Sequence, residues 1–236
     1  MSTAIKHSAE RLLRGTGVLS GPVPNTLFNS VTELISQSLP VFAAYVMKEG
    51  ITNEDGLNSH LALFIAKRVR QNNLPFIVQH QSMEDVMRGD SPKPDIGIHL
   101  DTDDVAEPSP RITVFEGKRL TTQLEAKRRR EYVVGHVKNG KYIKGGIERF
   151  KHSIHGRNLS HAGMIGYLQD STSEHWLNQI NNWITELCSQ QHDPAWSERE
   201  QLTLHTADGR VTEYFSVALR KSDKLSLTHL WINLIP

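Results

Sequence analysis

Apolar residues change their spacing several times along this chain of 236 residues, from helical spacing to strand spacing and back. Over residues 53–71 they recur every three or four positions, which predicts an amphipathic helix that Asn53 can cap. Over 94–100 they alternate at Ile96, Ile98 and Leu100, which is typical of a half-buried strand. Because both periods occur in one chain, helices packed on a sheet are the expected architecture, a mixed α/β fold.

The same patterns predict the remaining elements. Residues 1–50 are mostly helical in pattern, and Pro40 is expected to end or restart a helix there. Further strands are predicted at 74–80, 111–118 and 162–168, a short helix follows Gly145-Gly146, and an amphipathic helix covers 173–190. The 111–118 strand is expected to run antiparallel to the 94–100 strand. Residues 121–142 are strongly charged, and their order is left open.

After Pro194 the pattern becomes entirely β, with strands expected at 200–206, 211–219 and 225–234. The chain therefore divides into an N-terminal helical extension (1–52), a core (53–190) and a C-terminal β meander packed on the core (191–236). No linker composition separates these parts, so we expect one structural domain.

Composition excludes several classes of protein. A single cysteine, Cys188, excludes a disulfide scaffold and a Cys-rich zinc module. No apolar run approaches the ~18 residues needed to cross a bilayer, and the N-terminal residues contain no apolar signal-peptide segment. With 22% charged residues, the chain is expected to be a cytoplasmic protein that does not bind membranes.

Charge is distributed unevenly along the chain. Residues 111–157 contain 13 Lys and Arg against four Asp and Glu, whereas residues 84–107 contain eight acids and two bases. An acidic stretch followed by a basic one suggests a cation site beside a surface for polyanions, although two solvated faces of opposite sign would give the same composition.

Two neighbouring predicted strands carry the residues with the clearest chemistry. Asp95 begins one strand, and Glu116 and Lys118 lie near the end of the next. Two adjacent carboxylates repel each other unless a cation lies between them, and magnesium prefers such oxygen ligands. Because side chains alternate along a strand, Lys118 faces the same side as Glu116 and could stabilise a phosphate in a transition state.

Pro94-Asp95 followed by Glu116-Gly117-Lys118 resembles the motif of the PD-(D/E)XK nuclease superfamily. This resemblance implies a restriction-endonuclease-like core with the order α-β-β-β-α-β. It implies that Asp95 and Glu116 bind Mg²⁺, with Mn²⁺ as an alternative ion and the Gly117 carbonyl as a further ligand. It also implies that Asp95, Glu116 and Lys118 are catalytic, with Lys118 assisting the attack of water on a phosphodiester.

The resemblance also implies an acidic residue on the helix before the first strand. Glu54 and Asp55 are both candidates. At 100° per residue, Glu54 lies near the apolar stripe of the helix and Asp55 lies away from it. We therefore assign Glu54 as the third metal ligand, although helix starts are irregular enough to keep Asp55 as the alternative.

Basic residues that follow this motif are candidates for gripping a nucleic-acid backbone. Tyr142 could stack or hydrogen-bond nearby, and Arg149 and Lys151 are expected to come closest to the reacting phosphate. For residues 127–130 alone, a charged excursion without any ligand remains an equal alternative. The assigned nucleic-acid-binding residues are Lys127, Arg128, Arg129, Arg130, Tyr142, Lys144, Arg149 and Lys151.

The sequence therefore predicts a magnesium-dependent nuclease that acts on DNA, with restriction or anti-phage defence as the implied setting. An RNA nuclease is one alternative, and a non-catalytic nucleic-acid or protein-interaction module with the nuclease fold is another. A homodimer and a regulatory partner subunit are further expectations. The twelve histidines are interpreted as surface or structural residues because no paired zinc-ligand spacing accompanies them.

Overall fold

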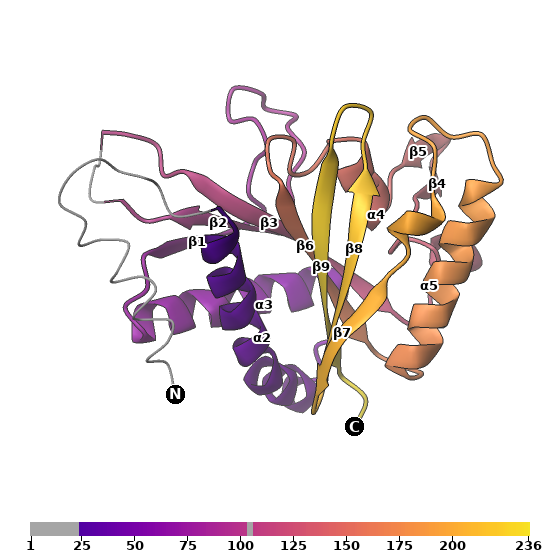
Figure 1. Cartoon of the computed structure of the whole chain (residues 1–236). Coiled ribbons are helices and arrows are strands. Elements are labelled where there is room, and N and C mark those ends of the chain that lie inside the picture. Colours follow the sequence, from indigo (N-terminus) through magenta and orange to yellow (C-terminus); the bar gives the residue numbers. More distant parts are fainter. Residues whose placement is uncertain (1–23, 103–105) are drawn as a thin grey trace.

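The computed structural model describes residues 24–102 and 106–236 of the chain (Figure 1). The predicted N-terminal extension before Pro24 lies outside these residues. The helices of the described part are α2 (Pro24–Glu49), α3 (Glu54–Gln71), α4 (Gly146–Lys151) and α5 (Ser173–Cys188), with short 3-10 turns η1 (Ala126–Arg128) and η2 (Glu198–Glu200). The strands are β1 (Phe76–His80), β2 (Ile96–Leu100), β3 (Arg111–Leu120), β4 (His136–Lys138), β5 (Lys141–Ile143), β6 (His161–Leu168), β7 (Thr203–Asp208), β8 (Val211–Leu219) and β9 (Lys224–Asn233).

Seven of these strands form one mixed sheet with the order β1-β2-β3-β6-β9-β8-β7. The predicted antiparallel pairing of β2 with β3 is confirmed. β3 pairs in parallel with β6, and β6 pairs in parallel with β9. Since β9 hydrogen-bonds directly to β6, the C-terminal meander continues the central sheet and does not pack on it as a separate layer.

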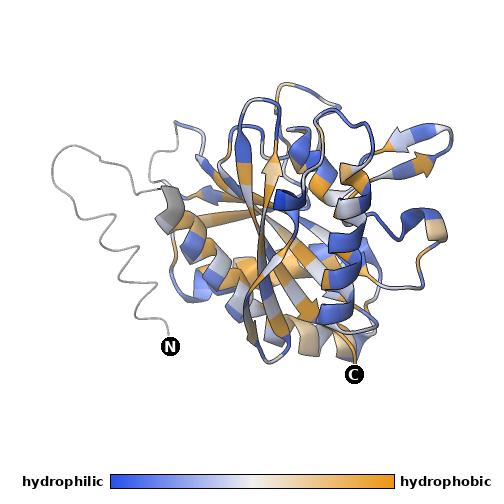
Figure 2. Ribbon diagram, turned by 45° about the vertical axis from the view of Figure 1, so that its right-hand side comes forward, coloured by the Kyte–Doolittle hydropathy of each residue, from blue (hydrophilic) through white to orange (hydrophobic). Residues whose placement is uncertain are grey.

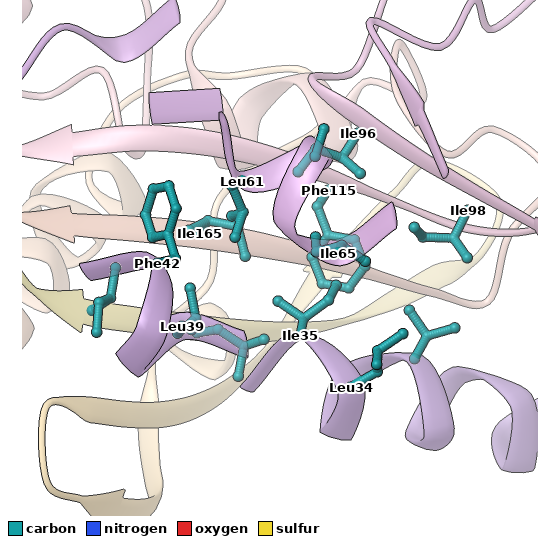
Figure 3. Packing of buried hydrophobic residues seen from close by; sticks show 14 of the residues in the cluster. Leu34, Ile35, Leu39, Phe42, Leu61, Ile65, Ile96, Ile98, Phe115 and Ile165 are labelled. Atoms are coloured by element: carbon teal, nitrogen blue, oxygen red, sulfur yellow. The ribbon is translucent and has the colours of Figure 1, made fainter. Parts of the chain in front are cut away.

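The sheet separates two hydrophobic cores. α2 and α3 cover one face, and α5 covers the other. Successive residues of β3 serve opposite cores, with Val114 on the α5 side and Phe115 on the α2–α3 side, as the alternation of a strand requires. Figure 3 shows Phe115 among the side chains of the α2–α3 core, and hydrophobic residues concentrate along the strands in Figure 2. The expectation of a mixed α/β fold is confirmed.

Helix α2 continues through Pro40, contrary to the prediction that this residue ends or restarts a helix. A proline inside a helix removes one backbone hydrogen bond and costs about 3 kcal/mol. Pro40 is exposed, whereas Leu39 before it and Phe42 after it are fully buried. Burial of apolar residues on both sides of the proline outweighs the lost bond, because each fully buried side chain contributes about 1.5–3 kcal/mol.

The charged segment over 121–142 is ordered around buried side chains. Tyr132, Val133 and Val134 pack into the α5-side core between η1 and the hairpin formed by β4 and β5. The charges of this segment therefore cover an apolar base. Among the described residues, no helix combines the length and apolar character needed to span a bilayer.

Candidate active site

Asp95 and Glu116 lie opposite each other at the end of the β2–β3 ladder. The paired residues Ile96 and Phe115 end this ladder, so the next pair in register is Asp95 with Glu116, and both project to the same face. The backbone N–H of Gly117 donates to Asp95 Oδ2 at 2.8 Å. Asp95 thus extends the ladder with its side chain and holds its carboxylate beside that of Glu116.

Lys118 lies between two carboxylates at this end of the sheet. Its Nζ donates to Glu54 Oε1 at 2.7 Å and lies 3.0 Å from Glu116 Oε1. Glu54 reaches the sheet from the first turn of α3, where Asn53 caps the helix as expected. Asp55 is exposed, so the prediction that Glu54 faces the sheet and Asp55 faces away is confirmed.

Gly117 allows helix α3 to approach β3 at this point. A Cβ atom at residue 117 would lie 1.9 Å from Asn58 Oδ1, which is far inside contact distance. Asn58 is buried, and its Oδ1 accepts a hydrogen bond from the Tyr167 hydroxyl at 2.8 Å. The glycine of the Glu-Gly-Lys motif therefore leaves room for a helix that carries Glu54 to the site.

Two further side chains surround Glu116. Arg149 Nη1 donates to Glu116 Oε1 at 2.7 Å, so this residue, assigned to nucleic-acid binding, also neutralises the buried carboxylate. His155 Nδ1 lies 3.2 Å from Glu116 Oε2 without hydrogen-bond geometry, and His155 is almost completely buried. Sequence reasoning missed His155, because the histidine has no motif and reaches Glu116 only through the tertiary fold.

The charges of the site shift the pKa values of its members. Burial, followed by the nearby charge of Glu116, raises the pKa of Asp95 to about 7. Burial alone would also raise the pKa of Glu116, but Lys118, His155 and Arg149 outweigh it and hold that pKa well below its ordinary value. Burial would lower the pKa of Lys118, yet the surrounding carboxylates raise it above its ordinary value. Lys118 therefore stays protonated. Asp95 has too little positive charge nearby to offset its burial and the charge of Glu116, so its pKa remains high.

A cavity of about 410 Å³ opens beside Glu54 and Lys118. Its acidic lining residues are Glu54, Glu125 and Glu131. Twice as many lysines and arginines line it, so its field favours anions. These basic residues are Lys118, Lys127, Arg128, Lys138, Lys144 and Arg149.

Four of the residues assigned to nucleic-acid binding lie outside the lining of this cavity: Arg129, Arg130, Tyr142 and Lys151. Arg129 donates to the Leu124 carbonyl, and Arg130 pairs with Glu186 of α5. Tyr142 is exposed, but its hydroxyl donates to Glu148.

The assignment of Lys151 to nucleic-acid binding is wrong. Its side chain is 0% exposed and forms an ion pair with Glu200, with Nζ 2.8 Å from each carboxylate oxygen. Nζ also donates to the Leu219 carbonyl at 2.9 Å. Lys151 is therefore buried between α4, η2 and the end of β8, where a phosphate cannot reach it.

The assignment of Glu54 as a third metal ligand is not supported by the geometry. Among residues 24–102 and 106–236, no group of three or more His, Cys, Asp or Glu side chains is arranged to hold a metal ion. Glu54 is instead paired with Lys118. Asp95 and Glu116 do suit a cation, because the pKa of Asp95 is raised and Glu116 Oε2, although 3.2 Å from His155 Nδ1, accepts no hydrogen bond from the described residues. Two carboxylates are enough for Mg²⁺, which keeps several waters.

Comparison of this chain with protein-family models, with curated proteins and with solved structures gives no match. A function for the protein must therefore be argued from the geometry of its own residues.

Proposed function

We propose that this protein is a metal-dependent nuclease that hydrolyses phosphodiester bonds of DNA. The observation that carries the proposal is the cross-strand pair Asp95–Glu116 with a buried ammonium, Lys118, 3.0 Å from Glu116 and at the wall of a cationic cavity. An acidic pair that attracts a cation, beside a cavity that attracts anions, suits a substrate whose reacting group is a phosphate.

The order of elements also supports the proposal. From α3 to β6 the chain forms helix, three antiparallel strands, helix and a strand parallel to β3, with the small hairpin β4–β5 inserted. This order agrees with the α-β-β-β-α-β order that the resemblance of Asp95 and Glu116-Gly117-Lys118 implies. The choice of DNA, and a setting in restriction or anti-phage defence, rest on that resemblance.

Each residue of the site has a separate role in this mechanism. Asp95 and Glu116 would hold Mg²⁺ or Mn²⁺, which supplies Lewis acidity and lowers the pKa of bound water. The carbonyl of Gly117, the further ligand that the resemblance implies, accepts from Lys118 Nζ at 3.1 Å. Lys118 stays protonated because its pKa is raised; it therefore acts as a positive charge on the phosphate or on the attacking water and not as a general base. Glu54 positions that ammonium through the 2.7 Å contact.

Arg149 and His155 keep Glu116 ionised. Their contacts with the two carboxylate oxygens, together with Lys118, lower the pKa of Glu116. A carboxylate that remains negative in a buried position can bind a cation across the whole range of working pH. Arg149 also lines the cavity. The N–H groups that it does not donate to Glu116 and to the Lys144 carbonyl can contact phosphate oxygens there.

Cleavage of supercoiled plasmid DNA by the purified chain tests the proposal. Nicking or linearisation is expected with Mg²⁺ or Mn²⁺, and none with a chelator. Asp95→Asn should reduce the rate by at least about 100-fold, in the range seen when one catalytic group is removed. Asp55→Asn, on an exposed neighbour of Glu54, should leave the rate unchanged. Equal rates for both variants would contradict the assigned site.

One observation favours a second function, a non-catalytic nucleic-acid-binding module. The described residues lack a three-ligand metal group, and Lys118 and Arg149 already neutralise one oxygen of Glu116. A module of this kind would bind DNA in the absence of metal and would not cut it with any divalent ion. Parallel assays with RNA of the same sequence distinguish a ribonuclease from both.

A further inference from the structure

The loop between β1 and β2 is braced by its own hydrogen bonds. Asp85 N donates to Ser91 Oγ at 2.8 Å, Met87 N donates to Asp85 Oδ1 at 3.0 Å, and Ser91 N donates to the Arg88 carbonyl at 3.1 Å. We refer to residues 85–91 as the β1–β2 tip. In Figure 1 the chain between β1 and β2 forms a loop that rises above the ends of the strands. These contacts give the β1–β2 tip a defined shape.

Two apolar side chains lie at the end of the β1–β2 tip. Val86 is 80% exposed and Met87 is 89% exposed, and these are the two most exposed large hydrophobic side chains of the described residues. Their exposure is unfavourable in water. Neighbouring exposed apolar residues at the end of a braced loop indicate a contact with another molecule.

The base of this loop is fastened to the candidate active site. Glu84 Oε1 accepts from the N–H of Gly156 at 2.6 Å, and Glu84 Oε2 pairs with Arg111 at 2.8 Å. Gly156 follows His155, which lies against Glu116. At the other end of the loop, the carbonyl of Asp95 itself accepts from Gln81 N at 2.8 Å. The base of the loop that carries the β1–β2 tip is therefore held beside the candidate carboxylates.

A second cavity, of about 560 Å³, adjoins the β1–β2 tip. Arg88, Arg111, Arg157 and His152 line it, together with the acids Glu84 and Asp85. Glu84 is already engaged by Arg111 and Gly156. Arg88 is likewise engaged, because it donates to Asp90 Oδ1 from Nε at 3.2 Å and from Nη2 at 3.1 Å. Arg157 is exposed and its guanidinium forms no ion pair within the described part of the chain, so it is available to an anion.

Size and charge decide which molecule fits this surface. A stable protein interface buries about 800 Å² on each partner, far more than two side chains at the end of a loop provide. Nucleic-acid-binding proteins, in contrast, often insert one or two apolar side chains between base steps while neighbouring cations hold the phosphates. Arg157, in the cavity beside Val86 and Met87, matches the second arrangement.

We propose that Val86 and Met87 insert between base pairs of bound duplex DNA, while Arg157 contacts its phosphates. This inference rests on the proposed function and deepens it. It assigns both cavities, the one beside Lys118 and the one beside the β1–β2 tip, to the surface that DNA covers when its phosphate reaches Asp95 and Glu116. The insertion would unstack a base step next to the phosphodiester that is cut.

The test uses the full chain without divalent metal and a short DNA duplex that contains 2-aminopurine, a base whose fluorescence rises on unstacking. Wild type should raise the fluorescence. The double variant Val86→Ser/Met87→Ser should abolish the rise in fluorescence and weaken binding about 10-fold, because losing one stacking contact lowers the affinity by about that factor. Val41→Ser/Leu63→Ser, on exposed apolar residues of α2 and α3, is the matched control and should behave as wild type.

Phosphate contact is tested separately with Arg157→Gln. Loss of one phosphate contact should lower the slope of log affinity against log salt by about 1 and leave the fluorescence rise in place. Unchanged fluorescence and affinity in the Val86/Met87 variant, with plasmid cleavage retained by wild type, overturn the insertion and leave the nuclease standing. Dimers of wild type that the same variant dissociates would show that the tip binds a second copy and would also overturn it. Absence of DNA binding by wild type overturns both proposals.

Discussion

At the scale of single residues, Asp95 has the most unusual chemistry in the described chain. Burial and the charge of Glu116 raise its pKa from 3.8 to about 7. Between these values the folded protein holds a proton that the unfolded chain has released. Unfolding then releases a proton, so stability falls as the pH rises through this window. A single carboxyl makes the metal-free protein less stable near neutral pH, where a bound cation would have most effect.

Asp95→Asn should remove this pH dependence. An amide keeps the acceptor for the N–H of Gly117 but carries no charge, and each unit of pKa shift corresponds to about 1.4 kcal/mol. We expect the variant to be about 1–3 kcal/mol more stable than wild type near pH 8 without metal, and equal to it near pH 4. Urea unfolding across this range measures the difference. A difference that persists at pH 4 would contradict the assigned cause.

The element scale shows how α3 and β3 depend on each other. Glu54 reaches Lys118 only because α3 lies directly on Gly117, where Asn58 fills the space of a side chain. The capping residue Asn53 begins the helix one position before Glu54. The cap and the glycine together determine where this carboxylate lies.

Gly117→Ala should therefore destabilise the protein and displace Glu54. The added methyl overlaps the Asn58 side chain, and overpacking of this kind costs about 1–3 kcal/mol. Gly89→Ala is a control, because nothing lies within 4 Å of its Cβ position. A double variant with Asn58→Ala should recover part of the loss, as a double-mutant cycle by urea unfolding would measure. Purely additive effects would exclude the steric explanation.

The ion pair between Lys151 and Glu200 connects α4 to η2 and to β8. Glu200 also accepts from the N–H groups of Ser197 and Leu219, so one buried carboxylate joins three segments of the chain. Such a pair is expected to fix the position of α4, and with it Arg149 at the active site.

Lys151→Met should cost about 3–5 kcal/mol, because it leaves the charge of Glu200 buried without its partner. Lys221→Met removes the lysine of an exposed pair, in which both side chains are more than two-thirds exposed, and should cost no more than about 1 kcal/mol. Thermal unfolding of both variants provides the comparison. Similar losses for the two would show that burial does not govern the strength of the Lys151 pair.

At the scale of the whole molecule, different elements cover the two faces of the sheet. α2 and α3 close one core, while the other face carries α4, α5 and the charged segment over 121–142. The candidate site lies at the end of β2 and β3, where residues from α3, the loop after α4 and the cationic cavity meet. The seven-stranded sheet holds these parts in fixed positions.

Substitution of basic residues should separate the cavity from the rest of the charged segment. Lys127→Gln/Lys138→Gln, which changes two lining residues of the cavity, should weaken DNA binding about 5- to 10-fold at low salt and reduce its salt dependence. Arg129→Gln, on an exposed residue outside the lining, should change the affinity less than twofold. Fluorescence anisotropy at several salt concentrations measures both. Equal effects would indicate binding by overall charge and no path through the cavity.

The sequence by itself determined most of the helices and strands and the pattern of chemistry along them. Strand and helix periods depend on which residues are apolar at local spacing, so the strands over 94–100 and 111–118, the cap at Asn53 and the inward orientation of Glu54 were all predictable. The pairing of Asp95 with Glu116 followed from the expected antiparallel neighbours. Each of these inferences needs only residues that are close in the chain or on adjacent strands.

Only the tertiary structure decided which of the charged residues meet. Local spacing does not show that Lys118 takes up the carboxylate of Glu54, that His155 lies against Glu116, or that Lys151 is buried on Glu200. Tertiary packing also explains Pro40 inside α2, because burial of its apolar neighbours against the sheet outweighed the tendency of proline to end a helix. These outcomes depend on the packing of distant segments, and their free energies come from desolvation and charge pairing that exist only once the chain has folded.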